Sequence, residues 1–236
     1  NMSALVTVVI PAYNCQAWVA EAIDSALAQD HANVEVVVVN DGSTDGTLSV
    51  LRGYGDRIRL VDQKNAGPPA ARNAGLAAAR GQYIAFLDAD DVWWPTKLSD
   101  QVSFLQGHPD VGTVVSTWEV WAPQGDGRFA RPAAPPPRAA GETPRALWCG
   151  WRYNELLFDC ELLTTCVLMR ADVVHQVGSF DTGLWNGDDY DYWLRASRVA
   201  KLAKLERPGA LYRMLPNSVS RKPRTVNAEL DVLQMA

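Results

Sequence analysis

Apolar runs of strand length alternate with amphipathic, helix-like segments along the first ninety residues. The runs are rich in β-branched residues and have almost no polar face, as in a parallel sheet covered on both sides. The intervening segments repeat their apolar residues at helical spacing, for example at Trp18, Val19, Ala22 and Ile23. The pattern predicts strands over 5–10, 34–39, 58–61 and 82–87, and helices over 18–27, from about 47, and over 70–80.

This βαβαβαβ order predicts an α/β fold with an open, mostly parallel twisted sheet, right-handed crossovers and helices on both faces. In such sheets, ligands bind beyond the carboxyl ends of the strands. Three polar clusters follow predicted strands, at 11–14, 40–43 and 88–91. We therefore expect these clusters to meet at one edge of the sheet.

The second half is less regular. We expect a helix over 97–105, strands over 111–118 and 162–169, a helix over 171–177, and an acidic helix start within 187–195. Residues 121–144 are rich in Pro, Gly, Ala and Arg, which is typical of a loop inside a domain rather than of a linker.

Asp88 and Asp90 lie two positions apart at the end of a predicted strand, so their carboxylates project to the same side. Two carboxylates so placed attract a hard cation, and Mg²⁺ is typically bound by one or two carboxylates together with substrate phosphates. The alternative is a solvated acidic turn before the helix near Pro95. The convergence of the polar clusters favours the metal–phosphate interpretation. Helix capping is a similar alternative for Asp188 and Asp189.

Composition narrows the function classes. The chain has 236 residues, 47% of them hydrophobic and 21% charged, as in ordinary globular proteins. A net charge of −5 argues against nucleic-acid binding. No apolar run reaches the roughly 20 residues of a membrane span, and we see no signal-peptide pattern at the start. Four cysteines without C-x-x-C spacing are interpreted as reduced cytosolic thiols.

Six stretches of the chain resemble family 2 glycosyltransferases, which are inverting enzymes of the GT-A fold that use sugar nucleotides. They cover most of residues 5–200 in the family's order: VVIPAYN (8–14), VVNDGSTDGT (38–47), NAGPPAARNAG (65–75), YIAFLDADD (83–91), VGSFD (177–181) and GDDYDYWLR (187–195). The resemblance implies one GT-A domain over 1–236, with a nucleotide-sugar-binding half to about 118 and an acceptor-binding half from about 119.

The resemblance also implies residue roles. Tyr13 is expected against the nucleobase, and Asp41 is expected to accept a hydrogen bond from the base, which favours uracil or thymine. Arg72 is expected at the base edge or the diphosphate. Asp189 corresponds to the general base that deprotonates the acceptor. The nucleotide-sugar site then comprises Pro11, Ala12, Tyr13, Asn14, Asp41, Arg72, Asp88, Ala89 and Asp90, with Asp90 and Asp88 at Mn²⁺ or Mg²⁺.

Two departures from the family pattern stand out. The acidic pair is Asp188-Asp189 where the family usually has Glu-Asp, so the two residues could exchange roles. Leu215 occupies a position that often carries a histidine, which puts the strength of metal binding in doubt. Among nine tryptophans, Trp185 and Trp94 are candidates for stacking on a sugar ring.

The sequence therefore predicts transfer of a sugar from a UDP- or dTDP-sugar to a hydroxyl of a saccharide or lipid-linked acceptor, in polysaccharide or glycolipid assembly. By family analogy the protein is placed in the cytosol, with contact at the inner face of the membrane left open. The alternatives are a non-catalytic sugar-nucleotide-binding module, a haloacid-dehalogenase-type phosphatase matching Asp88-x-Asp90-x-Val92, and a sugar nucleotidyltransferase, for which no Gly-rich, Lys-bearing loop is found.

Overall fold

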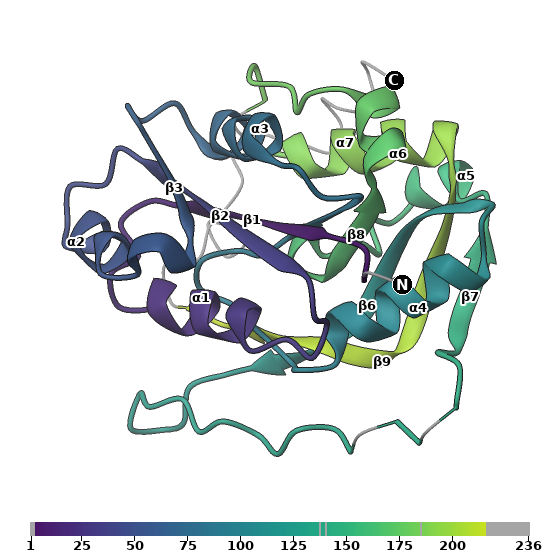
Figure 1. Cartoon of the computed structure of the whole chain (residues 1–236), viewed down its shortest axis with the longest axis horizontal. Coiled ribbons are helices and arrows are strands. Elements are labelled where there is room, and N and C mark those ends of the chain that lie inside the picture. The colour runs from purple at the N-terminus through teal and green to yellow at the C-terminus, as the bar shows by residue number, and fades with distance from the viewer. Residues whose placement is uncertain (1–2, 137, 140, 185, 216–236) are drawn as a thin grey trace.

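The computed structural model describes residues 3–136, 138–139, 141–184 and 186–215. Its first half forms a parallel sheet in the order β3-β2-β1-β4 (Figure 1). The strands are β1 (Val6–Ala12), β2 (Val34–Asp41), β3 (Arg59–Gln63) and β4 (Tyr83–Phe86). The predicted alternation of strands and helices is confirmed in this half, where β1, β2 and β4 are largely buried and the edge strand β3 is partly exposed.

The second half continues the same sheet with mixed pairing. β8 is antiparallel to both β4 and β6, β6 is parallel to β9, and β5 and β7 are antiparallel to β9. The strands are β5 (Val92–Trp93), β6 (Val111–Trp121), β7 (Ala146–Gly150), β8 (Val167–Arg170) and β9 (Lys201–Arg213). The open α/β fold is as predicted, but parallel pairing prevails only in the first half.

Helices cover both faces of the sheet (Figure 1), with α3, α6 and α7 on one side and α1 and α4 on the other. The helices are α1 (Val19–Leu27), α2 (Thr47–Arg52), α3 (Pro68–Ala78), α4 (Lys97–Gly107), α5 (Tyr153–Leu156), α6 (Ala171–Val177) and α7 (Asp188–Val199), with 3₁₀ turns η1 (Gly55–Arg57) and η2 (Thr164–Cys166). In the described residues, no helix combines the length and apolar character that crossing a membrane requires.

Several boundaries differ from the sequence prediction for physical reasons. β1 continues through Pro11, because β4 pairs with β1 only as far as Val9 and the missing N–H of Pro11 therefore costs no bond on that side. The segment predicted as a strand over 162–169 begins as η2 and becomes β8 only at Val167. The strands β5, β7 and β9 were not predicted. The proposed division near residue 118 stays a prediction, and β6 runs across it.

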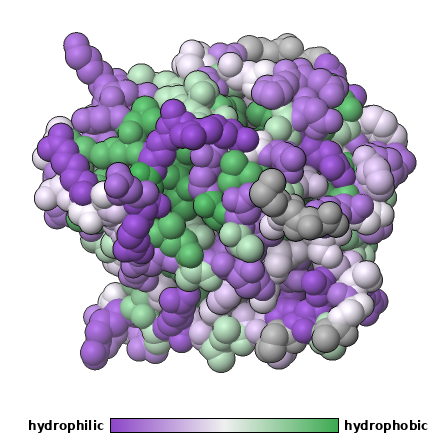
Figure 2. Space-filling view, in the orientation of Figure 1, coloured by the Kyte–Doolittle hydropathy of each residue, from purple (hydrophilic) through white to green (hydrophobic). Residues whose placement is uncertain are grey.

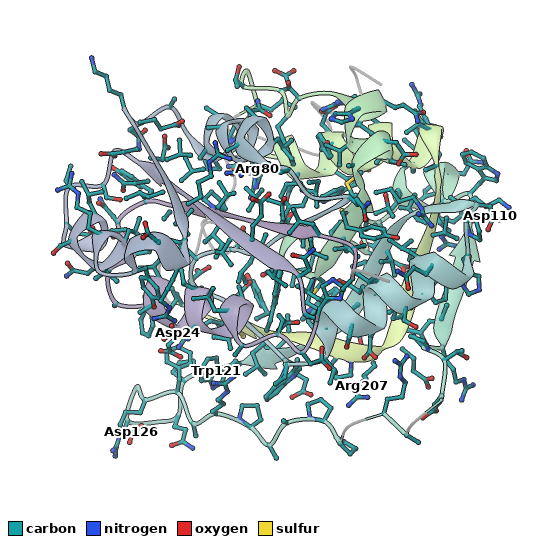
Figure 3. All side chains as sticks on the ribbon, viewed as in Figure 1. Asp24, Arg80, Asp110, Trp121, Asp126 and Arg207 are labelled. Atoms are coloured by element: carbon teal, nitrogen blue, oxygen red, sulfur yellow. The ribbon has the colours of Figure 1, made fainter. Side chains whose placement is uncertain are left out.

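A long loop joins β6 to β7 along one edge of the molecule (Figure 1). Trp121 and Arg207 lie on the side of the body that faces this loop (Figure 3). The Trp121 Nε1–H donates to the Ala130 carbonyl at 2.8 Å, and Arg207 donates to the Pro136 carbonyl. The predicted loop therefore belongs to the domain, which holds it by hydrogen bonds to the carbonyls of Ala130 and Pro136.

The core is a large cluster of buried apolar residues drawn from both halves of the sheet. Figure 2 shows apolar residues gathered near the middle of the viewed face, with hydrophilic residues around them. The four cysteines are free thiols, as the sequence predicted.

Candidate functional site

The loops after β1 and β2 are joined by the side chain of Asn14. Its Oδ1 accepts from the Thr44 main-chain N–H at 2.8 Å, and its own main-chain N–H donates to Ser43 Oγ at 3.1 Å. Asn14 has a φ of 47°, a left-handed conformation that asparagine tolerates better than most residues. The Tyr13 ring next to it is 51% exposed, so it is accessible to a ligand. Pro11 and Ala12 complete this edge as the last two residues of β1.

Asp41, at the end of β2, holds the loop that leads into α3. The side chain is only 3% exposed. Its Oδ1 accepts from Gln63 Nε2 at 2.7 Å and from the Ala66 N–H at 2.9 Å, while Oδ2 accepts from the Gly67 N–H at 2.9 Å. A carboxylate oxygen has room for a second donor, so Oδ2 retains capacity for the ring N–H of a base. That contact with a base stays a prediction.

Arg72 joins the two acidic motifs of the chain. Its Nη1 donates to Asp188 Oδ2 at 2.5 Å across 116 residues of sequence, and its Nη2 lies 3.5 Å from Asp88 Oδ1. Burial alone would lower the pKa of the guanidinium, but the carboxylates of Asp88 and Asp188 raise it above its ordinary value. The expected contact of Arg72 with the base edge or the diphosphate stays a prediction, and the structure adds two carboxylate partners to it.

An aromatic cluster brings the acidic start of α7 to the end of β4. Phe86, two residues before Asp88, meets Phe180 and Trp193 edge to face, with ring centroids 5.6 and 5.9 Å apart. Asn73, next to Arg72 on α3, donates to the Phe180 carbonyl and accepts from the Phe180 N–H. Because α7 carries Trp193 on its buried face, this packing fixes where Asp188 and Asp189 lie.

The two neighbouring carboxylates of α7 have different surroundings. Asp188 is buried against Arg72, and burial raises its pKa to about 6 although Arg72 opposes the shift. Asp189 is partly exposed and accepts from Thr164 Oγ1 at 3.1 Å, whereas the ion pairs of Arg72 in the described residues are with Asp88 and Asp188. Both residues begin α7, where negative side chains are favoured by the helix dipole. The geometry therefore leaves Asp189 as the carboxylate available to a ligand.

The three carboxylates of the acidic loop after β4 differ in burial and therefore in role. Asp88 and Asp90 are partly exposed, whereas Asp91 is buried and accepts from the Arg213 N–H at 2.9 Å. Burial, and then the charge of Asp88, raise the pKa of Asp90 to about 6. Asp91 therefore anchors the loop to β9, while Asp88 and Asp90 stay partly exposed on either side of Ala89. Because β4 ends at Phe86 and the Asp91 N–H donates to the Asp88 carbonyl at 3.1 Å, the motif is a turn and not the extended strand end that we expected.

The donor set at Asp88 and Asp90 fits a hard divalent cation. Both residues offer carboxylate oxygens, the ligands that hard cations prefer. Burial and the negative charge of Asp88 disfavour ionisation of Asp90, and a bound cation would offset this repulsion between the two carboxylates. Within the described part of the chain, no three His, Cys, Asp or Glu side chains form a metal cluster. A cation here would therefore be held by one or two carboxylates together with phosphate and water, which is typical of Mg²⁺.

The two tryptophan candidates have different outcomes. Trp94 is 3% exposed and packs with Val92, Trp121 and Leu211, so in this structure it belongs to the core rather than offering its ring to a sugar. Trp185 lies outside the described residues. Leu215 follows β9 and is partly buried.

A cavity of about 430 Å³ lies under the long loop, lined by residues of α4, β6 and β9. It contains none of the predicted site residues, so we keep it apart from the candidate site.

Sequence reasoning missed Thr164, which contacts Asp189, and Thr165, whose Oγ1 lies 3.3 Å from the Asp88 main-chain nitrogen. The only sequence signal for them is two adjacent hydroxyl residues inside an otherwise apolar run.

Comparison with known proteins agrees with this arrangement. Residues 7–140 match the family model described as glycosyl transferase family 2. An uncharacterized glycosyltransferase of Rickettsia felis is 35% identical over 203 residues, which cover 84% of this chain and 32% of the relative. The chain thus spans about a third of that protein. The Escherichia coli protein named UDP-Glc:alpha-D-GlcNAc-diphosphoundecaprenol beta-1,3-glucosyltransferase WfaP is 41% identical over 105 residues, 43% of this chain and 41% of its own length.

Solved structures of low sequence identity share the fold. Residues 1–349 of Staphylococcus aureus TarS in complex with UDP-GlcNAc superpose with a TM-score of 0.75 at 21% identity, covering 98% of this chain and 65% of that one. The mannosyltransferase PcManGT of Pyrobaculum calidifontis, in complex with GDP-Man and Mn²⁺, gives 0.63 at 21% identity, covering 93% of this chain and 59% of that one. These neighbours show the GT-A fold. By its matched family model and its relatives, the chain belongs to glycosyl transferase family 2.

Proposed function

We propose that the chain transfers a sugar from a nucleoside-diphosphate sugar, with UDP or dTDP favoured, to an acceptor hydroxyl with inversion at the anomeric carbon. The observation that carries the proposal is the pairing of Arg72 with both Asp88 and Asp188, since it puts the donor-side carboxylates and the acidic start of α7 around one guanidinium. The family match, and relatives and neighbours named for UDP-Glc, UDP-GlcNAc and GDP-Man, support a sugar nucleotide as donor.

The donor half would bind the nucleotide through its three loops. Tyr13 offers an exposed aromatic face to the base, and Asp41 offers one oxygen to a ring N–H. Asp90 and Asp88 would hold Mn²⁺ or Mg²⁺ against the diphosphate, and a cation bound there supplies Lewis-acid stabilisation of the leaving charge. A neighbour that contains Mn²⁺ supports this assignment.

Asp189 would act as the general base. Its Oδ2 accepts from Thr164 and its Oδ1 from its neighbour's N–H, so the carboxylate is oriented while remaining partly exposed. It takes the proton of the acceptor hydroxyl as that oxygen bonds to the anomeric carbon. The bond from this carbon to the diphosphate oxygen breaks on the opposite face, and the leaving nucleoside diphosphate keeps the electron pair. One displacement of this kind inverts the anomeric centre, by the same logic as in inverting glycosidases.

Arg72 would hold the two halves of the site together and would keep Asp188 paired, which supports Asp189 rather than Asp188 as the proposed base. The acceptor is proposed to be a saccharide or lipid-linked sugar in surface-polysaccharide or glycolipid assembly. The names of the Escherichia coli relative and of a putative teichuronic acid biosynthesis glycosyltransferase, TuaG of Bacillus subtilis, support this class.

Calorimetry with UDP, dTDP and GDP, each with and without Mn²⁺, tests the proposal. We expect UDP or dTDP to bind most tightly and only with metal, and Asp90→Asn to lose the metal-dependent part of binding. The exposed Asp126→Asn serves as the matched control, because Asp126 pairs with Arg128 in the long loop and with no other cation among the described residues. Tightest binding of GDP would contradict the role of Asp41, and binding by none of the three would contradict the proposal.

A non-catalytic module of the same fold is a second candidate, because Leu215 stands where the family often has a histidine. Incubating the protein with UDP-sugars and Mn²⁺ separates the functions. A transferase releases some UDP by donor hydrolysis, a binding module releases none, and a phosphatase releases inorganic phosphate instead.

A further inference from the structure

Arg213, the last residue of β9, is only 1% exposed and donates three hydrogen bonds to other segments. Its Nε donates to the Asp90 carbonyl at 2.7 Å, its Nη2 donates to Glu21 Oε2 at 3.0 Å, and its main-chain N–H donates to Asp91 Oδ1 at 2.9 Å. Two of these acceptors belong to the acidic loop, one main-chain carbonyl and one side chain, and the third is a side chain of α1.

Three aromatic rings surround the same guanidinium. Its central carbon lies 4.1 Å from the ring centroid of Trp121, 4.6 Å from that of Trp18 and 5.0 Å from that of Phe129. Trp18 precedes α1, whereas Trp121 and Phe129 belong to the end of β6 and to the long loop. Figure 3 shows Trp121 between the body and that loop. An arginine so placed combines planar stacking with directed hydrogen bonds, which a lysine cannot reproduce.

These contacts connect the segments that carry the proposed donor site. Glu21 lies on α1, just after the loop of Tyr13 and Asn14, and Asp90 is one of the two proposed cation ligands. A hydrogen bond to the Asp90 carbonyl restrains the backbone from which the Asp90 carboxylate projects. Among the described residues, Arg213 makes no hydrogen bond or ion pair with the Asp90 carboxylate, although its positive charge opposes the rise in the pKa of that group.

We propose that Arg213 is a positioning residue, which fixes the backbone of Asp90 against α1 and so sets the cation and diphosphate site of the donor. This inference rests on the proposed function. Residues behind metal ligands typically change metal affinity about 10–100-fold when they are removed. We expect an effect of this size on metal-dependent nucleotide binding.

A purely structural arginine of similar design lies elsewhere on the sheet and provides the control. Arg170, the last residue of β8, donates through Nε to the Val111 carbonyl at 2.9 Å and through Nη2 to the Leu105 carbonyl at 2.5 Å. Its guanidinium also lies over an aromatic ring, that of Tyr83, at 5.7 Å. Tyr83 begins β4, so Arg170 lies at the strand end opposite to the acidic loop.

The experiment compares Arg213→Lys with Arg170→Lys in the full chain. UDP binding is measured by calorimetry with and without Mn²⁺, well below the melting temperature of either variant. We expect Arg213→Lys to weaken Mn²⁺-dependent binding about tenfold or more, and Arg170→Lys to stay within about twofold of the parent, even at equal loss of thermal stability. Equal weakening in both variants, or none in Arg213→Lys, would overturn the proposal.

Hydrogen exchange of the segment 86–94 gives a second readout that needs no ligand. Arg213→Lys is expected to exchange faster than the parent in this segment, and Arg170→Lys is not. If the parent protein binds no nucleotide, the proposed function fails, while faster exchange in Arg213→Lys alone still supports the positioning of Asp90. Unchanged exchange in Arg213→Lys would refute the positioning role whatever the ligand proves to be.

Discussion

The two halves of the sheet build their share of the site in different ways. In the parallel half, each polar loop directly follows its own strand, and the loops after β1 and β2 support each other, as when the Asn14 side chain accepts from the Thr44 N–H. In the mixed half, the functional side chains reach the site through contacts that span much of the chain. Arg72 meets Asp188 across 116 residues, and Arg213 meets Asp90 across 123.

The two halves therefore contribute different kinds of groups to the candidate site. The parallel half presents ordered main-chain and carboxylate groups, which suits a ligand with a constant nucleotide part. The mixed half adds one acidic helix and one buried arginine to this frame. The position of the proposed base then depends on packing, mainly that of the cluster of Phe86, Phe180 and Trp193.

Asp189→Asn should have the largest effect on activity, because it removes the base that the mixed half contributes. General-base catalysis is typically worth ~10²–10⁴-fold, so we expect transfer to fall by that factor while UDP binding stays within about twofold. Asp191→Asn is the matched control, since Asp191 lies on the same helical turn but pairs with Arg195. Steady-state transfer assays on both variants make the comparison, and near-normal turnover in Asp189→Asn would remove this residue from the role.

Arg72→Met should break the link between the halves. Removing one partner of a buried ion pair typically costs about 3–5 kcal/mol, because the remaining charges of Asp88 and Asp188 lose their compensation. Arg80 is the control, because its side chain is 66% exposed where it pairs with the partly buried Glu35, and Arg80→Met should cost about 0–1 kcal/mol. Urea unfolding at neutral pH measures both. If the two variants lose similar stability, the link does not hold the halves together.

Lys97→Met should reveal a pH-dependent cost in the mixed half. Burial lowers the pKa of the Lys97 ammonium to about 7, although its Nζ donates to Gln101 Oε1. Below pH 7 the lysine is charged in both states, so the full cost of burying the charge is present. From about pH 7 to 10.5 only the unfolded chain binds the proton, so the stability of the parent rises with pH.

The variant lacks this titration. We therefore expect the stability of the parent relative to Lys97→Met to rise by on the order of 3 kcal/mol between pH 6 and 9.5. Chemical unfolding over this pH range measures the trend, with the exposed Lys64→Met as control. A difference that stays constant with pH would mean that Lys97 keeps its proton in the folded protein.

Trp94→Phe should have the smallest effect on activity. Trp94 is buried in an apolar cluster, and its Nε1–H has no hydrogen-bond partner among the described residues. We expect a stability loss of about 1 kcal/mol and KM values for donor and acceptor within about twofold of the parent. A tenfold rise in either KM would return Trp94 to the sugar-binding surface.

The parallel half could be predicted well from the sequence because its signals are local. Buried strands such as Val34–Asp41 are apolar on both faces, and the polar residues at their ends mark the ligand edge. Only the boundaries shifted, by one to three residues, as when β3 proved to be Arg59–Gln63 rather than 58–61.

The mixed half could be predicted only in part because its signals are not local. β9 mixes two lysines, two arginines and Pro208 with its apolar residues, and its pairing with β6 has register shifts near Ser116 and Thr117. Trp94 illustrates the same limit, since an aromatic side chain next to the acidic motif has the same sequence signal whether it faces a sugar or the core. The partners of Arg72 and Arg213 depend on tertiary packing, which a single sequence does not record.

A crystal structure with a UDP-sugar, Mn²⁺ and an acceptor analogue would test most directly whether the halves share one site. We expect the base against Tyr13 and Asp41, the diphosphate and metal at Asp90, and an Asp189 oxygen within hydrogen-bond distance of the acceptor hydroxyl. A nucleotide bound in the cavity under the long loop would contradict this arrangement. So would an anomeric carbon facing away from Asp189.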